Sequence, residues 1–185
     1  MKITQEFVVP RHTDEVWDFF QDVPSVAQCL PGAELAGQND TGAYEGKLSA
    51  KMGPMTATFE GTATVTPDPE TRTATIEGKG VDKRGGSRGQ VKVVYVITQE
   101  GSGTRVSVDA DVTLSGPAAQ FGRTGLINEM SKRLIGDFVS CLEAKLEAET
   151  TEEAAAVRAA EVRGVSLFFS SLWAWFKGLF SKGSE

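Results

Sequence analysis

The sequence predicts an α+β fold in which a curved antiparallel sheet of about seven strands wraps around one long helix. Apolar and polar residues alternate with period two through most of residues 33–114, and Gly- and Pro-containing turns separate the runs. Apolar residues then recur at spacings of three and four from residue 121 to residue 146. Alternation gives each strand one dry and one wet face, which is typical of an antiparallel sheet exposed to water on one side.

The chain opens with a predicted strand, Lys2–Val9, which Pro10 ends. A short helix should follow, capped by Thr13 or Asp14, with an apolar face of Val16, Trp17, Phe19 and Phe20. Pro24 ends that helix and precedes a second one over Ser25–Leu30. Pro31 and Gly32 end the second helix, because proline cannot continue a helix and glycine makes the turn.

The remaining strands are predicted from their alternation and from the turns between them. Runs at 33–38, 43–52, 55–66 and 105–114 are separated or flanked by turn sequences at Gly53-Pro54, Pro67-Asp68-Pro69-Glu70, Gly85-Gly86 and Gly101-Ser102-Gly103. Two further strands fall between residues 70 and 101, which gives about six strands after the two short helices.

A long helix should begin at Ser115-Gly116-Pro117, since proline is tolerated in a first helical turn. Its pattern fades into an Ala-, Glu- and Thr-rich stretch that is either a solvated helix or a flexible tether. We therefore expect a helix-grip ligand domain over residues 1–147, a linker over 148–163 and an amphipathic helix over 164–182.

Charge and cysteine usage restrict the class of protein. The formal net charge is −6, so nucleic acid is not an expected partner. The N-terminus has no apolar signal segment. The two cysteines, Cys29 and Cys141, lie far apart in apolar runs and are expected to be buried thiols in a reducing compartment. The expected location is therefore the cytoplasm.

The sequence contains little that indicates catalysis. The single histidine, His12, is expected to be solvated in a loop, and no metal-ligand set accompanies it. The glycine-rich stretch Gly85–Gly89 lies between strands and predicts a hairpin turn rather than a phosphate loop. The acidic residues Glu45, Glu60, Asp109 and Asp111 fall on wet faces, where no tuned pKa is expected. We expect no enzymatic activity, no covalent cofactor and no metal.

Small residues dominate the predicted inner face of the sheet, and they leave two interpretations open. They could leave a cavity between the sheet and the long helix, or they could mark bends and bulges in a curved sheet. The larger inner-face neighbours are apolar and would suit a greasy ligand. The candidate ligand-binding residues are Phe20, Leu30, Met52, Met55, Phe59, Tyr95, Phe121, Met130 and Leu134.

The segment 164–180 is strongly amphipathic when its residues are placed at helical steps, and its apolar arc spans about 160°. As a helix it would be roughly 26 Å long, which is marginal for a bilayer core of about 30 Å. A helix that lies in the plane of the membrane surface fits this pattern better than one that spans the bilayer. The alternatives are that the helix docks on a partner protein or packs back on its own domain. The candidate membrane-binding residues are Phe168, Phe169, Leu172, Trp173, Trp175, Phe176, Leu179 and Phe180.

Three short segments carry a resemblance to a known family. They are Val16-Trp17-Asp18 with Asp22-Val23-Pro24, then Cys29-Leu30-Pro31-Gly32-Ala33, then Gly116-Pro117-Ala118-Ala119-Gln120-Phe121-Gly122-Arg123. With the order of elements, they resemble the carbon monoxide dehydrogenase G-subunit family, which belongs to the START-like, Bet v 1-like helix-grip superfamily. The resemblance covers about residues 1–146, and the tail is similar to family members only in its amphipathic character.

The resemblance implies a cavity for hydrophobic ligands and an accessory role beside carbon monoxide dehydrogenase at the cytoplasmic face of the membrane. With the tail, it suggests that the domain takes a respiratory quinone such as menaquinone from the bilayer and presents it to the soluble dehydrogenase, or tethers that enzyme there. The expected partners are that enzyme, membrane lipid and a hydrophobic small molecule. Two other hypotheses remain: a cyclase-type enzyme of the same fold, and a ligand-free scaffold.

Overall fold

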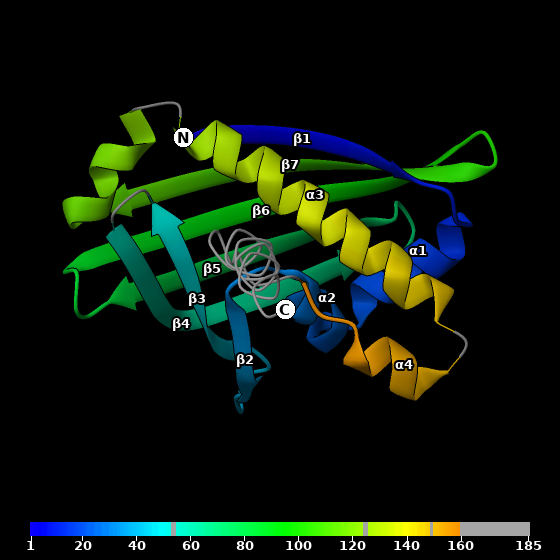
Figure 1. Ribbon diagram of the computed structural model, residues 1–185, viewed down its shortest axis with the longest axis horizontal. Coiled ribbons are helices and arrows are strands. Elements are labelled where there is room, and N and C mark those ends of the chain that lie inside the picture. The colour runs from blue at the N-terminus through cyan, green and yellow to red at the C-terminus, as the bar shows by residue number, and fades with distance from the viewer. Residues whose placement is uncertain (53–54, 124–125, 149, 160–185) are drawn as a thin grey trace, which may run out of the picture.

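The computed structural model describes residues 1–52, 55–123, 126–148 and 150–159. Seven strands form one antiparallel sheet in the order β1-β7-β6-β5-β4-β3-β2, and helix α3 crosses its concave side (Figure 1). The strands are β1 (Lys2–Val9), β2 (Ala33–Gln38), β3 (Tyr44–Met52), β4 (Met55–Asp68), β5 (Thr73–Asp82), β6 (Ser87–Glu100) and β7 (Gly103–Ser115). The helices are α1 (Thr13–Gln21), α2 (Val23–Cys29), α3 (Leu126–Glu147) and α4 (Thr151–Ala156), and a 3₁₀ segment covers Gly116–Arg123. The predicted α+β class and seven-stranded sheet are confirmed.

Each short helix begins at a residue other than the one predicted. The N-cap of α1 is His12, whose Nδ1 accepts a hydrogen bond from the Asp14 backbone N–H at 3.5 Å. Thr13 is buried instead, with its hydroxyl 3.2 Å from that of Thr104. Helix α2 begins at Val23, because the Asp22 carboxylate accepts from the Ser25 N–H and Pro24 fits in the first turn.

The long helix starts later than the sequence predicted. Residues Gly116–Arg123 form a 3₁₀ segment, and the α-helix begins only at Leu126. Gly116 has φ +73°, and the Ala118 backbone N–H donates to the Ser87 hydroxyl at 3.0 Å. This bond, between two buried residues, holds the segment against the β5–β6 hairpin instead of in line with α3.

The prediction of two free thiols is wrong. Cys29 at the end of α2 and Cys141 on α3 form a disulfide, with their Cα atoms 5.4 Å apart. Both residues are buried, as predicted. The sequence could not indicate this bond, because 112 positions separate the cysteines and only the folded sheet brings α2 beside α3.

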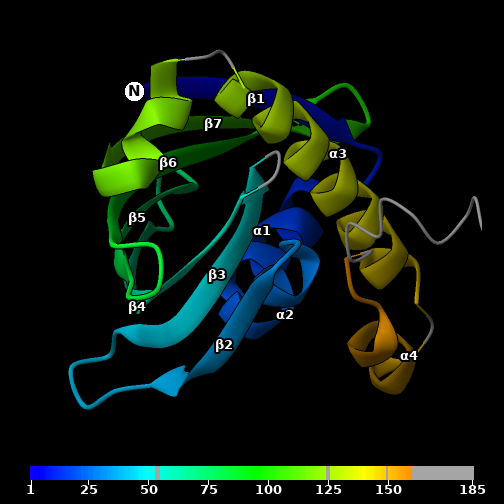
Figure 2. The same cartoon turned by 60° about the vertical axis from the view of Figure 1, so that its left-hand side comes forward.

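The part of the expected linker that the structure describes packs against the domain. Helix α4 lies within it, and the Lys145 side chain donates to the Ala154 carbonyl at 2.6 Å. The Ala159 backbone N–H donates to the Gln28 carbonyl at 2.9 Å, and Val157 packs on the main core. Residues 150–159 therefore return the chain to α2 (Figure 2).

Candidate functional site

Buried side chains gather at the two ends of the concave face. The larger cluster lies where α1, α2 and α3 meet the sheet, and it contains Phe19, Phe20, Tyr95, Phe138 and Leu142 among others. The smaller one consists of Ala57 and Ala118, with Phe59, Leu114 and Met130 packed against it. The middle of the concave face contributes no fully buried residue to either cluster, although Ile76 packs against the larger one.

Two cross-strand rows form this middle part, which we call the floor. Their register pairs Ile76, Val93, Ala110 and Ile3 in one row and Ala63, Gly78, Val91 and Val112 in the next. Every residue of the floor is apolar or glycine and only half-buried. In a filled core at crystal-like density such residues would be fully buried. Gly78 and Val91 also border a groove on the outer face, so the partial exposure of the other six floor residues is what indicates accessible apolar surface on the inner side of the sheet.

The next row of the inner face is a line of glycines, Gly46, Gly61, Gly80 and Gly89, paired across β3, β4, β5 and β6. A Cβ atom on Gly61 would lie 1.9 Å from the Lys79 carbonyl oxygen, and one on Gly46 would lie 2.5 Å from that of Glu34. Adjacent backbone occupies these positions, so both glycines permit close strand approach and bending. The bending interpretation thus holds at Gly46 and Gly61, while the floor beside them remains accessible.

The β2–β3 end of the concave face is open. Leu35 and Leu48 point inward by register, because Leu48 is paired with Phe59 and Leu35 with Gly46. They are nevertheless 38% and 43% exposed. Helix α3 packs mainly on β1, α2, α4 and the 3₁₀ segment, and β2 and β3 arch away from it (Figure 2).

The predicted ligand-binding residues divide between the two ends of the floor. Phe20, Leu30 and Tyr95 meet in the larger cluster, with the Phe20 and Tyr95 rings 4.8 Å apart. Phe59 and Met130 meet in the smaller cluster. Leu134 is half-buried on α3, one turn beyond Met130. Met52 and Met55 are paired at the β3–β4 hairpin, and their side chains and that of Phe121 lie outside the described part.

The predicted membrane-binding residues, from Phe168 to Phe180, lie outside the described residues. Among the residues that the structure does describe, no helix is both long and apolar enough to cross a membrane.

Tyr95 is the one described residue with a buried side-chain polar atom that has no hydrogen-bond partner among the described residues. It is 3% exposed and points from β6 into the larger cluster. Burial raises the pKa of its hydroxyl, and a weak interaction with the Gln21 side chain, which lies beyond hydrogen-bonding distance, partly offsets this effect. Leaving such a group unpaired costs about 1–3 kcal/mol, so a ligand acceptor within its reach would be stabilised.

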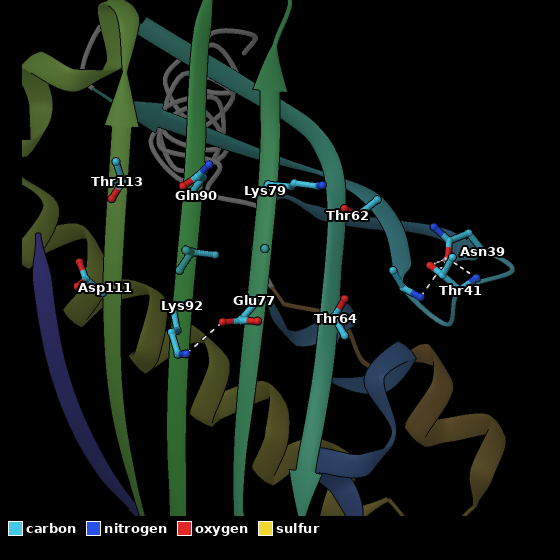
Figure 3. Close-up of a pocket in the computed structure, with 13 residues that line it drawn as sticks. Asn39, Thr41, Thr62, Thr64, Glu77, Lys79, Gln90, Lys92, Asp111 and Thr113 are labelled. Carbon is cyan, nitrogen blue, oxygen red and sulfur yellow. Dashed lines mark hydrogen bonds and ion pairs between the residues drawn. The ribbon is translucent and has the colours of Figure 1, made fainter.

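The outer face of the sheet carries a separate, polar groove with a volume of about 700 Å³ (Figure 3). Its base is formed by polar side chains from four neighbouring strands, namely Thr62, Lys79, Gln90 and Thr113. The β2–β3 loop lies along one side of the groove. Lys92 pairs with Glu77 at 3.1 Å in the same groove. None of the predicted ligand-binding residues lines it, and its polar side chains do not suit a greasy ligand.

The sequence predicted the exposed charged residues correctly but gave no sign of two buried ones, Asp82 and Lys145. Glu45, Glu60, Asp109 and Asp111 are exposed, as expected. Asp82 is buried and accepts from the backbone N–H groups of Arg84 and Gly85, which supports the predicted hairpin turn. Lys145 is also buried, and no local pattern signalled it. No cluster of metal-ligating side chains occurs among the described residues.

The sequence profile of the G subunit of carbon monoxide dehydrogenase (CoxG) matches residues 6–147. The chain belongs to the CoxG family. The three segments that carry the resemblance lie within the matched range, so the predicted family is confirmed for this CoxG protein. No curated protein matches the chain at a significant level.

Solved structures share the fold of this CoxG protein at low identity. A conserved protein from Geobacillus kaustophilus has a TM-score of 0.68 and 17% identity, over 79% of this chain and 95% of that one. Norcoclaurine synthase from Thalictrum flavum has a TM-score of 0.52 and 16% identity, over 80% and 89%. The ZhuI aromatase/cyclase from Streptomyces sp. R1128 has a TM-score of 0.50 and 18% identity, over 86% and 97%. These likenesses establish the helix-grip, Bet v 1-like fold.

Proposed function

We propose that this CoxG protein is a membrane-associated accessory protein that binds a hydrophobic ligand over the floor of its sheet. The proposed ligand is a respiratory quinone such as menaquinone. By carrying it, the protein would couple carbon monoxide dehydrogenase to the membrane and hand electrons to the quinone pool, or recruit that enzyme there. The observation that carries this proposal is the accessible apolar floor between two buried clusters.

The composition of the floor favours a ligand that is mostly hydrocarbon. Side chains such as Ile76, Val93 and Val112 offer no hydrogen bonds, so a polar ligand would lose its water contacts without replacement. Burying apolar ligand surface is favourable by about 25 cal/mol per Å². An isoprenoid chain of several units supplies such surface.

Tyr95 offers the polar contact that a quinone ring needs. Its hydroxyl is a hydrogen-bond donor without a partner among the described residues, and a quinone carbonyl is an acceptor. Because the hydroxyl is buried, the carbonyl would reach it only when side chains of the larger cluster move aside. The Phe20 ring, with its centroid 4.8 Å from that of Tyr95, offers an aromatic surface beside it. This arrangement would place the quinone ring at the α1–α2 end and the chain along the floor.

The fold neighbours support small-molecule binding within this architecture. The norcoclaurine synthase structure holds dopamine and hydroxybenzaldehyde, and ZhuI is an aromatase/cyclase. A cyclase-type enzyme needs ionisable side chains aimed at its substrate. The floor of this chain consists of aliphatic residues and glycine, which favours carriage over catalysis.

The membrane part of the proposal uses the amphipathic segment 164–180. Its large apolar residues would enter the acyl boundary, each contributing about 1.5–3 kcal/mol when fully buried. We propose a peripheral position on the cytoplasmic face of the membrane. The Cys29–Cys141 disulfide is typical of the opposite, oxidising side. Denaturing the chain at the moment of lysis and comparing its thiol labelling with and without a reductant tests this assignment, because a reducing compartment predicts two thiols that label without reduction.

The test of ligand binding is purification of the full chain from native membranes, followed by mass spectrometry of the extracted lipids. The proposal predicts an enriched quinone. Ala110→Trp fills the floor and should reduce that quinone to background, whereas Thr113→Trp, on the outer face of the same strand, should keep it. Circular dichroism confirms that both variants fold, and Tyr95→Phe serves as a milder second variant. No enriched isoprenoid in the wild-type protein would refute the proposal.

The test of membrane association is a chain that ends at Ala159. This truncation keeps α4 and its contacts with α2 and α3, so the domain stays as described. The proposal predicts that the truncated protein is fully recovered in the soluble fraction, while the full chain sediments with membranes. Membrane retention of the truncated protein would assign the attachment to another surface.

A further inference from the structure

We propose that the polar groove on the outer face of the sheet docks an extended acidic segment of a protein partner. The inference rests on the proposed function for the identity of that partner, carbon monoxide dehydrogenase, and adds the surface that it would use. Strands that carry the floor on their inner face form the groove on their outer face (Figure 3). A docked segment would therefore leave the ligand side of the sheet free.

The base of the groove is one continuous cross-strand row of hydrogen-bonding side chains. Lys79 on β5 is paired with Thr62 on β4 and with Gln90 on β6. Gln90 is paired in turn with Thr113 on β7. None of these four side chains has a hydrogen-bond or ion-pair partner among the described residues. Neighbouring strands lie about 4.8 Å apart, so the row is roughly 14 Å long, the length of about four residues of extended peptide.

The borders of the groove are held by bonds within the protein. In the next row, the charge of Glu77 is paired with Lys92 at 3.1 Å, and the Asp111 carboxylate lies 3.4 Å from the N-terminal ammonium group. On the other side, the Asn39 side chain accepts from the backbone N–H and the hydroxyl of Thr41 at 3.1 and 2.7 Å. The border charges are thus neutralised and the loop is fixed, which leaves the row as the part that can bind a partner.

Unpaired positive charge gathers at this row in a chain whose net charge is −6. Arg88 is paired with Val81, so it lies diagonally across from Lys79 on the outer face, about 7–8 Å away. Both are exposed, and neither has an ion-pair partner among the described residues. Arg84, in the turn between β5 and β6, is a third such cation. These charges would attract an acidic segment to the groove.

The shape of the groove favours a peptide over an anionic bilayer. Threonine hydroxyls and the Gln90 amide both donate and accept hydrogen bonds, so they can pair with backbone N–H and C=O groups of an extended segment. The Lys79 ammonium would pair with a carboxylate of that segment. A layer of lipid headgroups would meet the cations of the β5–β6 turn without using the recessed row of uncharged side chains.

Binding of purified carbon monoxide dehydrogenase to the immobilised full chain tests this surface. Lys79→Glu/Arg88→Glu should weaken the Kd about tenfold, because two attractions become repulsions. Thr113→Trp, which fills the groove without changing the charge, should weaken it as well. The matched control is Lys132→Glu/Arg133→Glu on the exposed side of α3, which changes the net charge equally and should keep the affinity.

The outcomes separate this inference from the proposed function. A dehydrogenase that binds the wild type and both groove variants equally, or that is weakened as much by the α3 control, overturns the docking site and leaves recruitment intact. No binding to the wild type overturns both. The quinone content of Thr113→Trp should stay at the wild-type level, so loss of the partner is not loss of the ligand.

A vesicle assay decides between a protein partner and a bilayer. The full chain and its Lys79→Glu/Arg88→Glu variant should bind vesicles of phosphatidylcholine and phosphatidylglycerol equally. Weaker vesicle binding by this variant together with unchanged dehydrogenase binding would assign the cations to the membrane and contradict the proposal.

Discussion

The side-chain ammonium of Lys145 lies 2.9 Å from the amide oxygen of Gln28, the residue that precedes the disulfide-bonded Cys29. Cys141 is one helical turn before Lys145 on α3. A covalent bond and a buried hydrogen bond thus join the same two helices, and the second bond of Lys145, to the Ala154 carbonyl, adds α4 to the junction.

Lys145→Met should release α4 from the domain. The change leaves the Gln28 and Ala154 oxygens without their donor, and a lost hydrogen bond from a charged group costs about 1.5–3 kcal/mol. Hydrogen exchange should show faster exchange of the Ala154, Val157 and Ala159 amides. Lys132→Met, on the exposed face of α3, should leave these amides unchanged. Unchanged protection in Lys145→Met would mean that other contacts hold α4.

Burial lowers the pKa of Lys145 from its usual 10.5, an effect opposed by the Asp22 carboxylate and increased by Arg158. Between the lowered pKa and 10.5, the unfolded chain binds more protons than the folded one, so this residue makes stability rise with pH. Below the lowered pKa, Lys145 is protonated in both the folded and the unfolded chain, so burial of its charge lowers the stability by an amount that no longer changes with pH. The raised pKa of Tyr95 makes stability fall as the pH rises above its usual 10.0. The contribution of Lys145 must therefore be measured as a difference between the wild type and a variant that lacks Lys145.

Urea unfolding of the wild type and of Lys145→Met across the alkaline range isolates this contribution. The difference in unfolding free energy between the two proteins should shift in favour of the wild type as the pH rises toward 10.5. A difference that is independent of pH would contradict the lowered pKa.

Breaking the disulfide should destabilise the domain without changing its sheet. It closes a loop of 112 residues, for which loss of a cross-link costs about 2–4 kcal/mol. Cys29→Ala/Cys141→Ala should lower the urea midpoint by the corresponding amount, and a reductant should have this effect only on the wild type. Mass spectrometry of the intact protein before and after reduction checks that the bond is present.

Alanine should have opposite effects on stability at Gly61, in the glycine line of the sheet, and at Gly136, on helix α3. Gly61→Ala should destabilise the protein by about 1–3 kcal/mol, because its Cβ would overlap the Lys79 carbonyl and backbone must move. Gly136 on α3 has no atom within 4 Å of an added Cβ, so Gly136→Ala should stabilise the helix by about 0.5–1 kcal/mol. Equal effects at both positions would contradict the role assigned to the glycine line.

Tyr95→Phe should separate stability from ligand binding. Removing an unpaired buried hydroxyl should leave the ligand-free protein as stable or slightly more stable. The affinity for a quinone should fall by about three- to tenfold, because the only proposed hydrogen bond to its carbonyl is lost. Thermal unfolding with and without added quinone measures both effects. An unchanged quinone affinity would place the ring elsewhere.

Local patterns in the sequence predicted most of the fold and part of the candidate site. Period-two alternation predicted the strands over residues 43–52, 55–66 and 105–114, because a strand's side chains alternate between its two faces regardless of its partners. The Cys29–Cys141 bond and the burial of Lys145 were not predictable, since each depends on α2 lying beside α3 in the folded chain. The late start of α3 depends on the bond between Ala118 and Ser87, which is likewise a contact between distant segments.

The most direct test is an experimental structure of the full chain purified from its native membranes. We predict elongated density over the floor between Tyr95 and Phe59, with an acceptor oxygen within hydrogen-bonding distance of the Tyr95 hydroxyl. A floor on which Ile76, Val93, Ala110 and Val112 are fully covered by side chains of the protein, with no space for an isoprenoid chain, would contradict the account.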